Sequence, residues 1–198
     1  MTVVLAPPAE YPQRFQWDRE SYMQFGSVPL FGFRRRPQLI RGELWDLGPM
    51  TPLHAAGICL LDRQLFPIIG ERYLMSCQCP LDLGPETMPL PDLAILDFDR
   101  TSYGERHPGG SDTLLVAEIA DNTQEFDLGI KAELYAVAGI PEYWVLDLNA
   151  RVLHVMRDPG PLAANGTAYR SQQTLTPDQS VSPLAAPDAT VNVADLLP

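Results

Sequence analysis

The chain has 198 residues, of which 45% are hydrophobic and 20% charged, and its formal net charge is −11. This length predicts one domain with a substantial core, and the composition is that of a globular protein. No apolar run is long enough to span a membrane, and the N-terminus lacks the basic and apolar regions of a secretory signal. Three cysteines argue against a disulfide framework. We therefore expect a cytoplasmic protein with no membrane partner.

The net charge has the wrong sign for non-specific binding to nucleic acid, which relies on lysine and arginine to neutralise phosphates. The arginines are partly clustered, however, because Arg34, Arg35, Arg36 and Arg41 fall within the short stretch "FRRRPQLIR". Such a run is more often a solvated turn than a binding patch. The charge thus counts against a nucleic-acid partner without excluding one.

The first half of the chain predicts two helices and a hairpin. A short helix is expected in 17–26, with Asp18 as its cap, and two apolar runs in 37–48 predict a strand pair that turns at Arg41 and Gly42. A longer helix is expected over 51–70. Thr51 caps this helix, Pro52 suits its first turn, and the expected apolar stripe consists of Ala56, Leu60, Leu61 and Leu65.

The second half is mostly strand-like. Strands are expected within 72–83, 91–98 and 113–120, and the long polar loop 99–112 is expected to be mobile. A helix over 127–138 should end at Gly139, because Pro141 prevents its continuation. A hairpin over 142–148 and 151–157 and a strand over 167–175 follow.

Helices before and after a run of strands predict an α/β (α+β) fold with a mixed sheet flanked by helices. We expect a single domain over 1–198, with an N-terminal extension at 1–14 and a C-terminal loop and tail at 176–198.

Two acidic residues stand at the ends of apolar strands. Asp92 follows Pro91 at the start of "LAIL", and Glu118 comes near the end of "LLVAEIA". Burying a carboxylate costs several kcal/mol unless it is paired or binds a metal. If the two strands are neighbours, the pair can hold a hard cation such as magnesium. Taken singly, each acid is more simply explained as a turn or solvent-facing residue.

Lys131 is the only lysine in the chain. The expected helix buries Ile130, Leu134 and Val137, and it places Lys131 on the flank shared with Asp127, Tyr135 and Ala138. An exposed i, i+4 ion pair with Asp127 is the simpler interpretation. The alternative is that Lys131 extends toward Glu118 and orients a water molecule or neutralises charge on a phosphoryl group.

Together, "LPDLAILDFD" and "LLVAEIADNTQEFDLGIKAELYAVAGIPEYWVLDL" resemble the Uma-type restriction endonucleases, a branch of the PD-(D/E)XK phosphodiesterase superfamily. The resemblance extends from about Phe15 to Arg157 and keeps four features in order. These are the Pro-Asp pair, the strand-end glutamate, the Asp-x-x-x-Lys helix and the Gly-Ile-Pro-Glu-Tyr-Trp segment.

The resemblance implies a restriction-endonuclease-like fold with a Mg²⁺ or Mn²⁺ site, in which Asp92 and Glu118 bind the metal and the backbone carbonyl of Ile119 contributes. The superfamily's usual lysine position is Ala120 here, and the resemblance implies that Lys131 on the next helix replaces it. Glu43 in "RGEL" is a further catalytic candidate or a plain solvent-facing residue. The implied activity is metal-dependent hydrolysis of phosphodiester bonds, with DNA as partner and a homodimer as the working form.

Four other residues are weaker candidates. His54 either contacts phosphate or serves as a cap or interface residue, and Tyr135 either bonds near Lys131 or packs. Cys77 and Cys79 have no second pair at zinc-like spacing, so we expect both in the core. A catalytically inactive binding or regulatory module on the same fold remains the alternative function, as does a purely structural ion-pair network.

Overall fold

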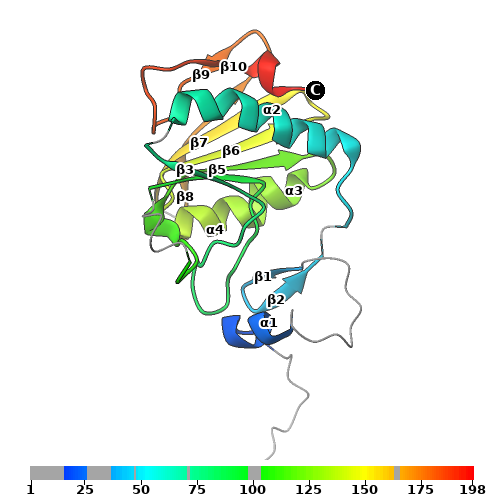
Figure 1. The fold of residues 1–198 in the computed structure, drawn as a ribbon, viewed down its shortest axis with the longest axis vertical. Coiled ribbons are helices and arrows are strands. Elements are labelled where there is room, and N and C mark those ends of the chain that lie inside the picture. The colour runs from blue at the N-terminus through cyan, green and yellow to red at the C-terminus, as the bar shows by residue number, and fades with distance from the viewer. Residues whose placement is uncertain (1–15, 26–36, 47, 71, 98–103, 163–165) are drawn as a thin grey trace, which may run out of the picture.

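The computed structural model describes residues 16–25, 37–46, 48–70, 72–97, 104–162 and 166–198. A six-stranded mixed sheet in the order β3-β4-β5-β6-β7-β8 lies at its centre, and only β5 and β6 run parallel. Figure 1 shows α2 on one face of this sheet and the α3–α4 segment on the other. The predicted α/β (α+β) fold is confirmed. The strands are β3 (Leu74–Cys77), β4 (Leu93–Leu96), β5 (Thr113–Ala120), β6 (Glu142–Asp147), β7 (Val152–Pro161) and β8 (Thr167–Leu175).

The N-terminal elements form as predicted. Helix α1 (Arg19–Phe25) begins after Asp18, whose Oδ1 accepts a hydrogen bond of 2.8 Å from the backbone N–H of Ser21. Strands β1 (Gln38–Ile40) and β2 (Glu43–Trp45) are antiparallel. The tight turn between them needs positive φ at Arg41 (52°) and Gly42 (76°). The Arg34–Arg36 run lies outside the described residues.

Helix α2 (Pro52–Ile69) begins at the predicted cap, where the His54 N–H donates to Thr51 Oγ1 at 3.1 Å. Its buried stripe differs from the prediction, because Ala56 and Leu60 are only half-buried. The helix approaches β5 most closely at Gly57, where an added Cβ would lie 2.9 Å from Ile119 Cγ2. A count of apolar residues gives no weight to glycine, so it misses this contact. The buried stripe is Gly57, Leu61, Leu65 and Ile69.

The helical segment after β5 begins earlier than expected and is irregular. It consists of α3 (Gln124–Phe126), a π-helical turn η3 (Asp127–Lys131) and α4 (Ala132–Val137). The predicted buried face is wrong, because Val137 is 63% exposed and Lys131 is buried. A π turn holds more residues than an α turn, so the register after it differs from a 3.6-residue period.

The C-terminal segment is ordered and belongs to the core, which corrects the expected loop and tail. Strands β9 (Ser180–Val181) and β10 (Val191–Asn192) pair, and the 3₁₀ helix η4 (Val193–Leu196) packs on α2 (Figure 1). Buried Glu142 holds this segment by accepting the Leu184 N–H at 2.7 Å. The apolar stretches here are too short to show a period.

In the expected loop 99–112, residues 98–103 lie outside the described residues. The described part is held by Arg106 Nη1, which lies 2.7 Å from Asp112 Oδ2 before the 3₁₀ helix η2 (Gly110–Asp112). None of the described helices is both long and apolar enough to cross a membrane.

Candidate active site

Asp92 and Glu118 lie side by side at one end of the central strands. Strands β4 and β5 are antiparallel with Leu93 opposite Ala117, so Asp92 is adjacent to Glu118 on the neighbouring strand. The Asp92 N–H lies 3.4 Å from Glu118 Oε2. Their exposed fractions are 6% and 2%, so Glu118 is not a solvent-facing residue. Two buried carboxylates in contact repel each other unless cations or hydrogen bonds compensate.

Donors on both sides fix the Asp92 carboxylate. The Ile119 N–H donates to Oδ2 at 2.9 Å, and His54 Nε2 lies 2.9 Å from Oδ1. Burial raises the pKa of Asp92, but the hydrogen bond and charge of His54, the charge of Lys131 and the Ile119 N–H together outweigh burial, and the pKa is lowered. Asp92 therefore remains ionised and holds the first turn of α2 through His54.

Glu118 is fully enclosed by the protein, with 2% of its surface exposed. Its Oε1 lies 2.8 Å from Lys131 Nζ and accepts the Tyr135 O–H at 2.7 Å. Burial raises the pKa of Glu118 to about 8, although the Lys131 charge opposes this. The Glu118 carboxyl group is contacted by three hydrogen-bond donors: the Lys131 ammonium, the Tyr135 O–H and the Asp92 N–H. Such a set of donors stabilises the ionised form. A further positive charge nearby would stabilise that form.

Lys131 lies between two acids rather than on the protein surface. Asp127 Oδ1 is 3.3 Å from Lys131 Nζ, so the i, i+4 pair exists, but both side chains are 2% exposed. Burial would lower the pKa of Lys131, yet the charges of Glu118, Asp127 and Asp92 raise it. Lys131 is therefore a permanent cation.

The π turn that carries these residues is anchored to the sheet. The Tyr143 O–H donates to the Asp127 carbonyl at 2.9 Å, and the Thr123 O–H donates to Asp127 Oδ2 at 2.5 Å. Burial raises the pKa of Asp127 as well. The turn thus holds Asp127 and Lys131 on one buried face; the 3.6-residue period predicted that they share a flank but not that the flank is buried.

The cluster opens into a cavity of about 840 Å³. Its walls come from the β1–β2 hairpin, the first turn of α2 and the segments that follow β3 and β5. The lining residues outside the cluster are Gln38, Trp45, Asp46, Gly48, Pro49, Met50, Thr51, Cys77, Gln78, Cys79, Leu90, Asp121, Asn122 and Thr123.

The structure brings Asp92, Glu118 and Lys131 together but leaves Glu43 apart. Glu43 is exposed on β2 and is not among the residues that line the cavity. It pairs with Ile40, two positions along the hairpin from the Gln38–Trp45 pair that borders the cavity. Its catalytic role remains a prediction, as does metal binding by the Ile119 carbonyl.

Sequence reasoning treated three contributors too lightly. His54 contacts Asp92, and Tyr135 bonds to Glu118 rather than only packing. The sequence predicts Asp127 only as a surface ion-pair partner of Lys131. Its position four residues before Lys131 was the signal that the two side chains are neighbours. The core prediction for Cys77 and Cys79 is wrong, because β3 ends at Cys77 and both border the cavity.

The chemistry of the cluster suits a hard cation. Asp92, Glu118 and Asp127 bring three buried carboxyl groups together beside the Lys131 ammonium and the His54 imidazole, so oxygen donors predominate in the cluster. Asp127 Oδ1 is buried and accepts no hydrogen bond in the described structure. Within the described ranges, no group of three or more His, Cys, Asp or Glu side chains is arranged to hold an ion by itself. Water or substrate oxygens would therefore complete the coordination, as is usual for Mg²⁺.

A mixed sheet flanked by helices, with acids and a lysine where two central strands meet, defines a nuclease-like fold. The structure resembles the crystal structure of a protein from Anabaena variabilis ATCC 29413, described as "a putative nuclease belonging to DUF820". The TM-score is 0.66 at 13% identity, and the match covers 88% of this chain and 96% of that one. At this identity the likeness shows the fold alone.

The chain belongs to the Uma2 family, whose model is described as "Putative restriction endonuclease" and matches residues 23–194. The family resemblance expected from the sequence is confirmed. A search of curated proteins finds no significant match.

Proposed function

We propose that this protein is a metal-dependent phosphodiesterase, and specifically a DNA endonuclease that hydrolyses phosphodiester bonds. The observation that carries the proposal is the buried Lys131 ammonium, which lies 2.8 Å from Glu118 beside Asp92 and faces the cavity. The nuclease descriptions of the family and of the structural neighbour support the same class.

Asp92 and Glu118 would hold Mg²⁺ or Mn²⁺, with the Ile119 carbonyl as a further ligand. When bound, the ion polarises the scissile phosphate and lowers the pKa of a coordinated water molecule. His54 and Tyr135 fix the orientation of the two carboxylates by hydrogen bonds, so the acids keep their positions before substrate enters.

Lys131 supplies a fixed positive charge. Because its pKa is raised by three carboxylates, it stays protonated and does not serve as a general base. It orients the attacking water and stabilises the negative charge that develops on the phosphoryl oxygens. An arginine could not replace it readily, since the space between Glu118 and Asp127 accommodates a compact ammonium group.

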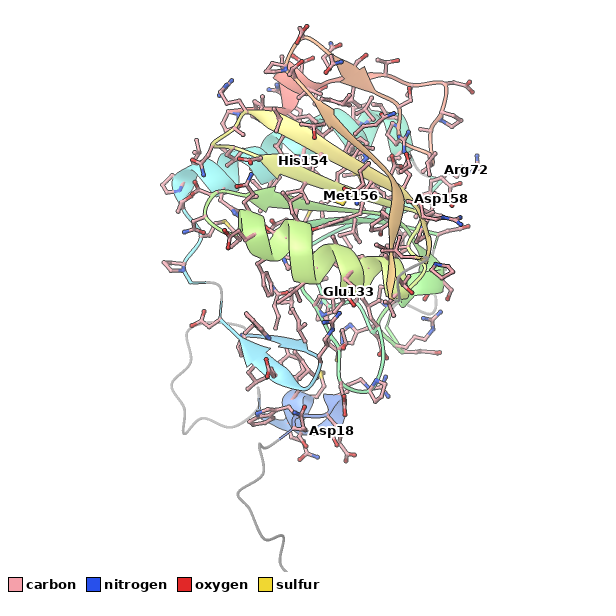
Figure 2. All side chains as sticks on the ribbon, turned by 180° about the vertical axis from the view of Figure 1, so that it is seen from behind. Asp18, Arg72, Glu133, His154, Met156 and Asp158 are labelled. Carbon is pink, nitrogen blue, oxygen red and sulfur yellow. The ribbon has the colours of Figure 1, made fainter. Side chains whose placement is uncertain are left out.

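A plasmid-nicking assay with Mg²⁺ or Mn²⁺ tests the proposal. We expect nicking by the wild type and its loss in Asp92→Asn and Lys131→Met. Glu133→Gln is the control. Glu133 lies on α4, where it pairs with Arg41, and it is not among the residues that line the cavity (Figure 2). Nicking that survives both site variants would show that the activity comes from elsewhere.

The alternative is a catalytically inactive binding module, which the net charge of −11 favours. It predicts no nicking with either metal, while Mn²⁺ still raises the thermal midpoint of the wild type but not of Asp92→Asn. A purely structural ion-pair network predicts that the metal leaves both midpoints unchanged.

A further inference from the structure

The cavity has a fixed aromatic wall and very few cations. Resting on the proposed function, we infer that the site takes a single-stranded stretch of nucleic acid rather than an intact duplex, and that a base of this strand stacks on Trp45. The geometry and charge of the cavity both favour a single strand.

The wall that carries Trp45 is firmly attached to the body of the protein. The Met88 N–H donates to the Leu39 carbonyl at 2.7 Å, and the Leu90 N–H donates to Gln38 Oε1 at 3.2 Å. Leu39 is fully buried. Since the chain reaches Asp92 two residues after Leu90, the β1–β2 hairpin is tied to the segment that carries a metal-binding acid. The hairpin is thus a fixed wall of the site.

Two aromatic side chains, Trp45 on the hairpin and Phe126 on α3, connect this wall with Lys131. The ring centroids of Trp45 and Phe126 are 4.7 Å apart, with 34° between their planes. Lys131 Nζ lies 5.8 Å from the centroid of the Phe126 ring. Trp45 borders the cavity, so a phosphate near Lys131 leaves its neighbouring base within reach of the indole. Stacking of bases on such side chains is the usual way to bind single strands without sequence preference.

The size of the cavity also favours an unpaired strand. A volume of about 840 Å³ is in the range of sites that enclose a small molecule, so it has room for about one or two nucleotides. A base that enters the cavity must leave the duplex stack, which costs a few kcal/mol in a duplex and least in a strand that is already single.

The charges around the cavity exclude the usual mode of duplex binding. Proteins hold duplex DNA by neutralising many phosphates with lysine and arginine. Here the lining contains one lysine, Lys131, and no arginine from the described ranges. Five of the described arginines, Arg19, Arg41, Arg106, Arg157 and Arg170, each form an ion pair with a carboxylate. The acids in the lining are Asp46, Asp92, Glu118, Asp121 and Asp127. Among the described residues, the metal site and the stacking surface are therefore the main sources of binding energy.

Tryptophan fluorescence tests the binding step without relying on cleavage. The wild-type protein, kept free of divalent metal so that it does not cut, is titrated with a short single-stranded oligonucleotide and with the same strand annealed to its complement. We expect quenching and tighter binding for the single strand. The substitution Trp45→Phe should remove most of the quenching. Trp17→Phe should leave the quenching in place, because Trp17 is not part of the cavity lining. Trp45→Ala should weaken single-strand binding roughly 5- to 100-fold.

Cleavage of the same substrates separates this inference from the proposed function. DNA and RNA single strands and the DNA duplex are compared with wild-type protein, and we expect a single strand to be cut at least about tenfold faster than the duplex. A duplex cut as fast as either single strand, or unchanged binding in Trp45→Ala, overturns the inference and leaves the nuclease standing. If no substrate is cut, the nuclease proposal fails. In that case tighter binding of the single strand than of the duplex still supports the inference, and equal binding overturns it.

Discussion

Removing the charge of Lys131 should strongly destabilise the fold. The substitution Lys131→Met keeps an unbranched apolar chain of similar length but leaves Glu118 and Asp127 without their cation. Both acids are buried, at 2.8 and 3.3 Å from the ammonium group, and solvent does not replace it. An uncompensated buried charge of this kind costs about 3–5 kcal/mol.

The size of this loss depends on pH in a definite direction. The Lys131 charge lowers the pKa of both acids against the effect of burial, so its removal raises both values further. An acid whose folded pKa is raised destabilises the fold above its unfolded pKa, because the folded state then holds a proton that the unfolded state releases. The difference between wild type and Lys131→Met should therefore grow as the pH rises through the folded-state pKa values of the wild-type acids, which for Glu118 is about 8, and shrink below them.

Thermal unfolding at about pH 9 and pH 5 measures both effects. For a chain of this size we expect the midpoint at the higher pH to fall by roughly 6–20 °C. Arg41→Met is the control, because the Arg41–Glu133 pair is half-exposed on both sides and should contribute at most about 1 kcal/mol. A Lys131→Met protein as stable as Arg41→Met, or a loss that does not change with pH, would refute the reasoning.

Three further outcomes follow from the same contacts. Because burial raises the pKa of Glu118 to about 8, Mn²⁺ binding must displace a proton at lower pH; calorimetry should show affinity falling by up to about tenfold per unit below pH 8, and a flat profile would remove Glu118 from the metal site. Gly57→Ala places a methyl group 2.9 Å from Ile119 Cγ2 and should cost about 1–3 kcal/mol in chemical denaturation, whereas an unchanged midpoint would mean that α2 can move away from β5. Glu142→Ala leaves Arg157 without its carboxylate and the Leu184 N–H without its acceptor. It should lower stability by about 3–5 kcal/mol and expose the C-terminal segment to protease, and resistance equal to wild type would contradict that role.

The sequence predicted the parts of the fold that local signals determine. The Asp18 and Thr51 caps, the turn at Arg41 and Gly42 and the order of the strands were all found as expected. These features depend on a few neighbouring residues whose preferences are strong. The sequence also predicted that Asp92 and Glu118 lie close together if their two strands are neighbours, and β4 and β5 do pair.

The features that sequence reasoning missed depend on long-range packing. Gly57 forms the contact to β5 through the absence of a side chain, and the segment after Pro177 becomes ordered only by covering α2. His54 was recognisable as a cap-adjacent histidine, but its bond to Asp92 joins residues 38 positions apart. No local pattern carries that information.

The π turn at Asp127–Lys131 makes the number of residues in this segment as important as their identity. Gly129 within it is exposed, and a Cβ added there would meet no other atom, so no side-chain packing depends on this residue. A chain one residue shorter would adopt the more regular α-helix, and everything beyond the deletion would rotate by about 100° relative to Asp127. Both ends of the segment are held, by Gln124 to Asp147 and by Tyr135 to Glu118, so that rotation would separate the lysine from its acids. The protein thus keeps a less regular helix that holds Lys131 against Glu118 and Asp127, and a single-residue deletion here should improve helical order while separating the lysine from both acids.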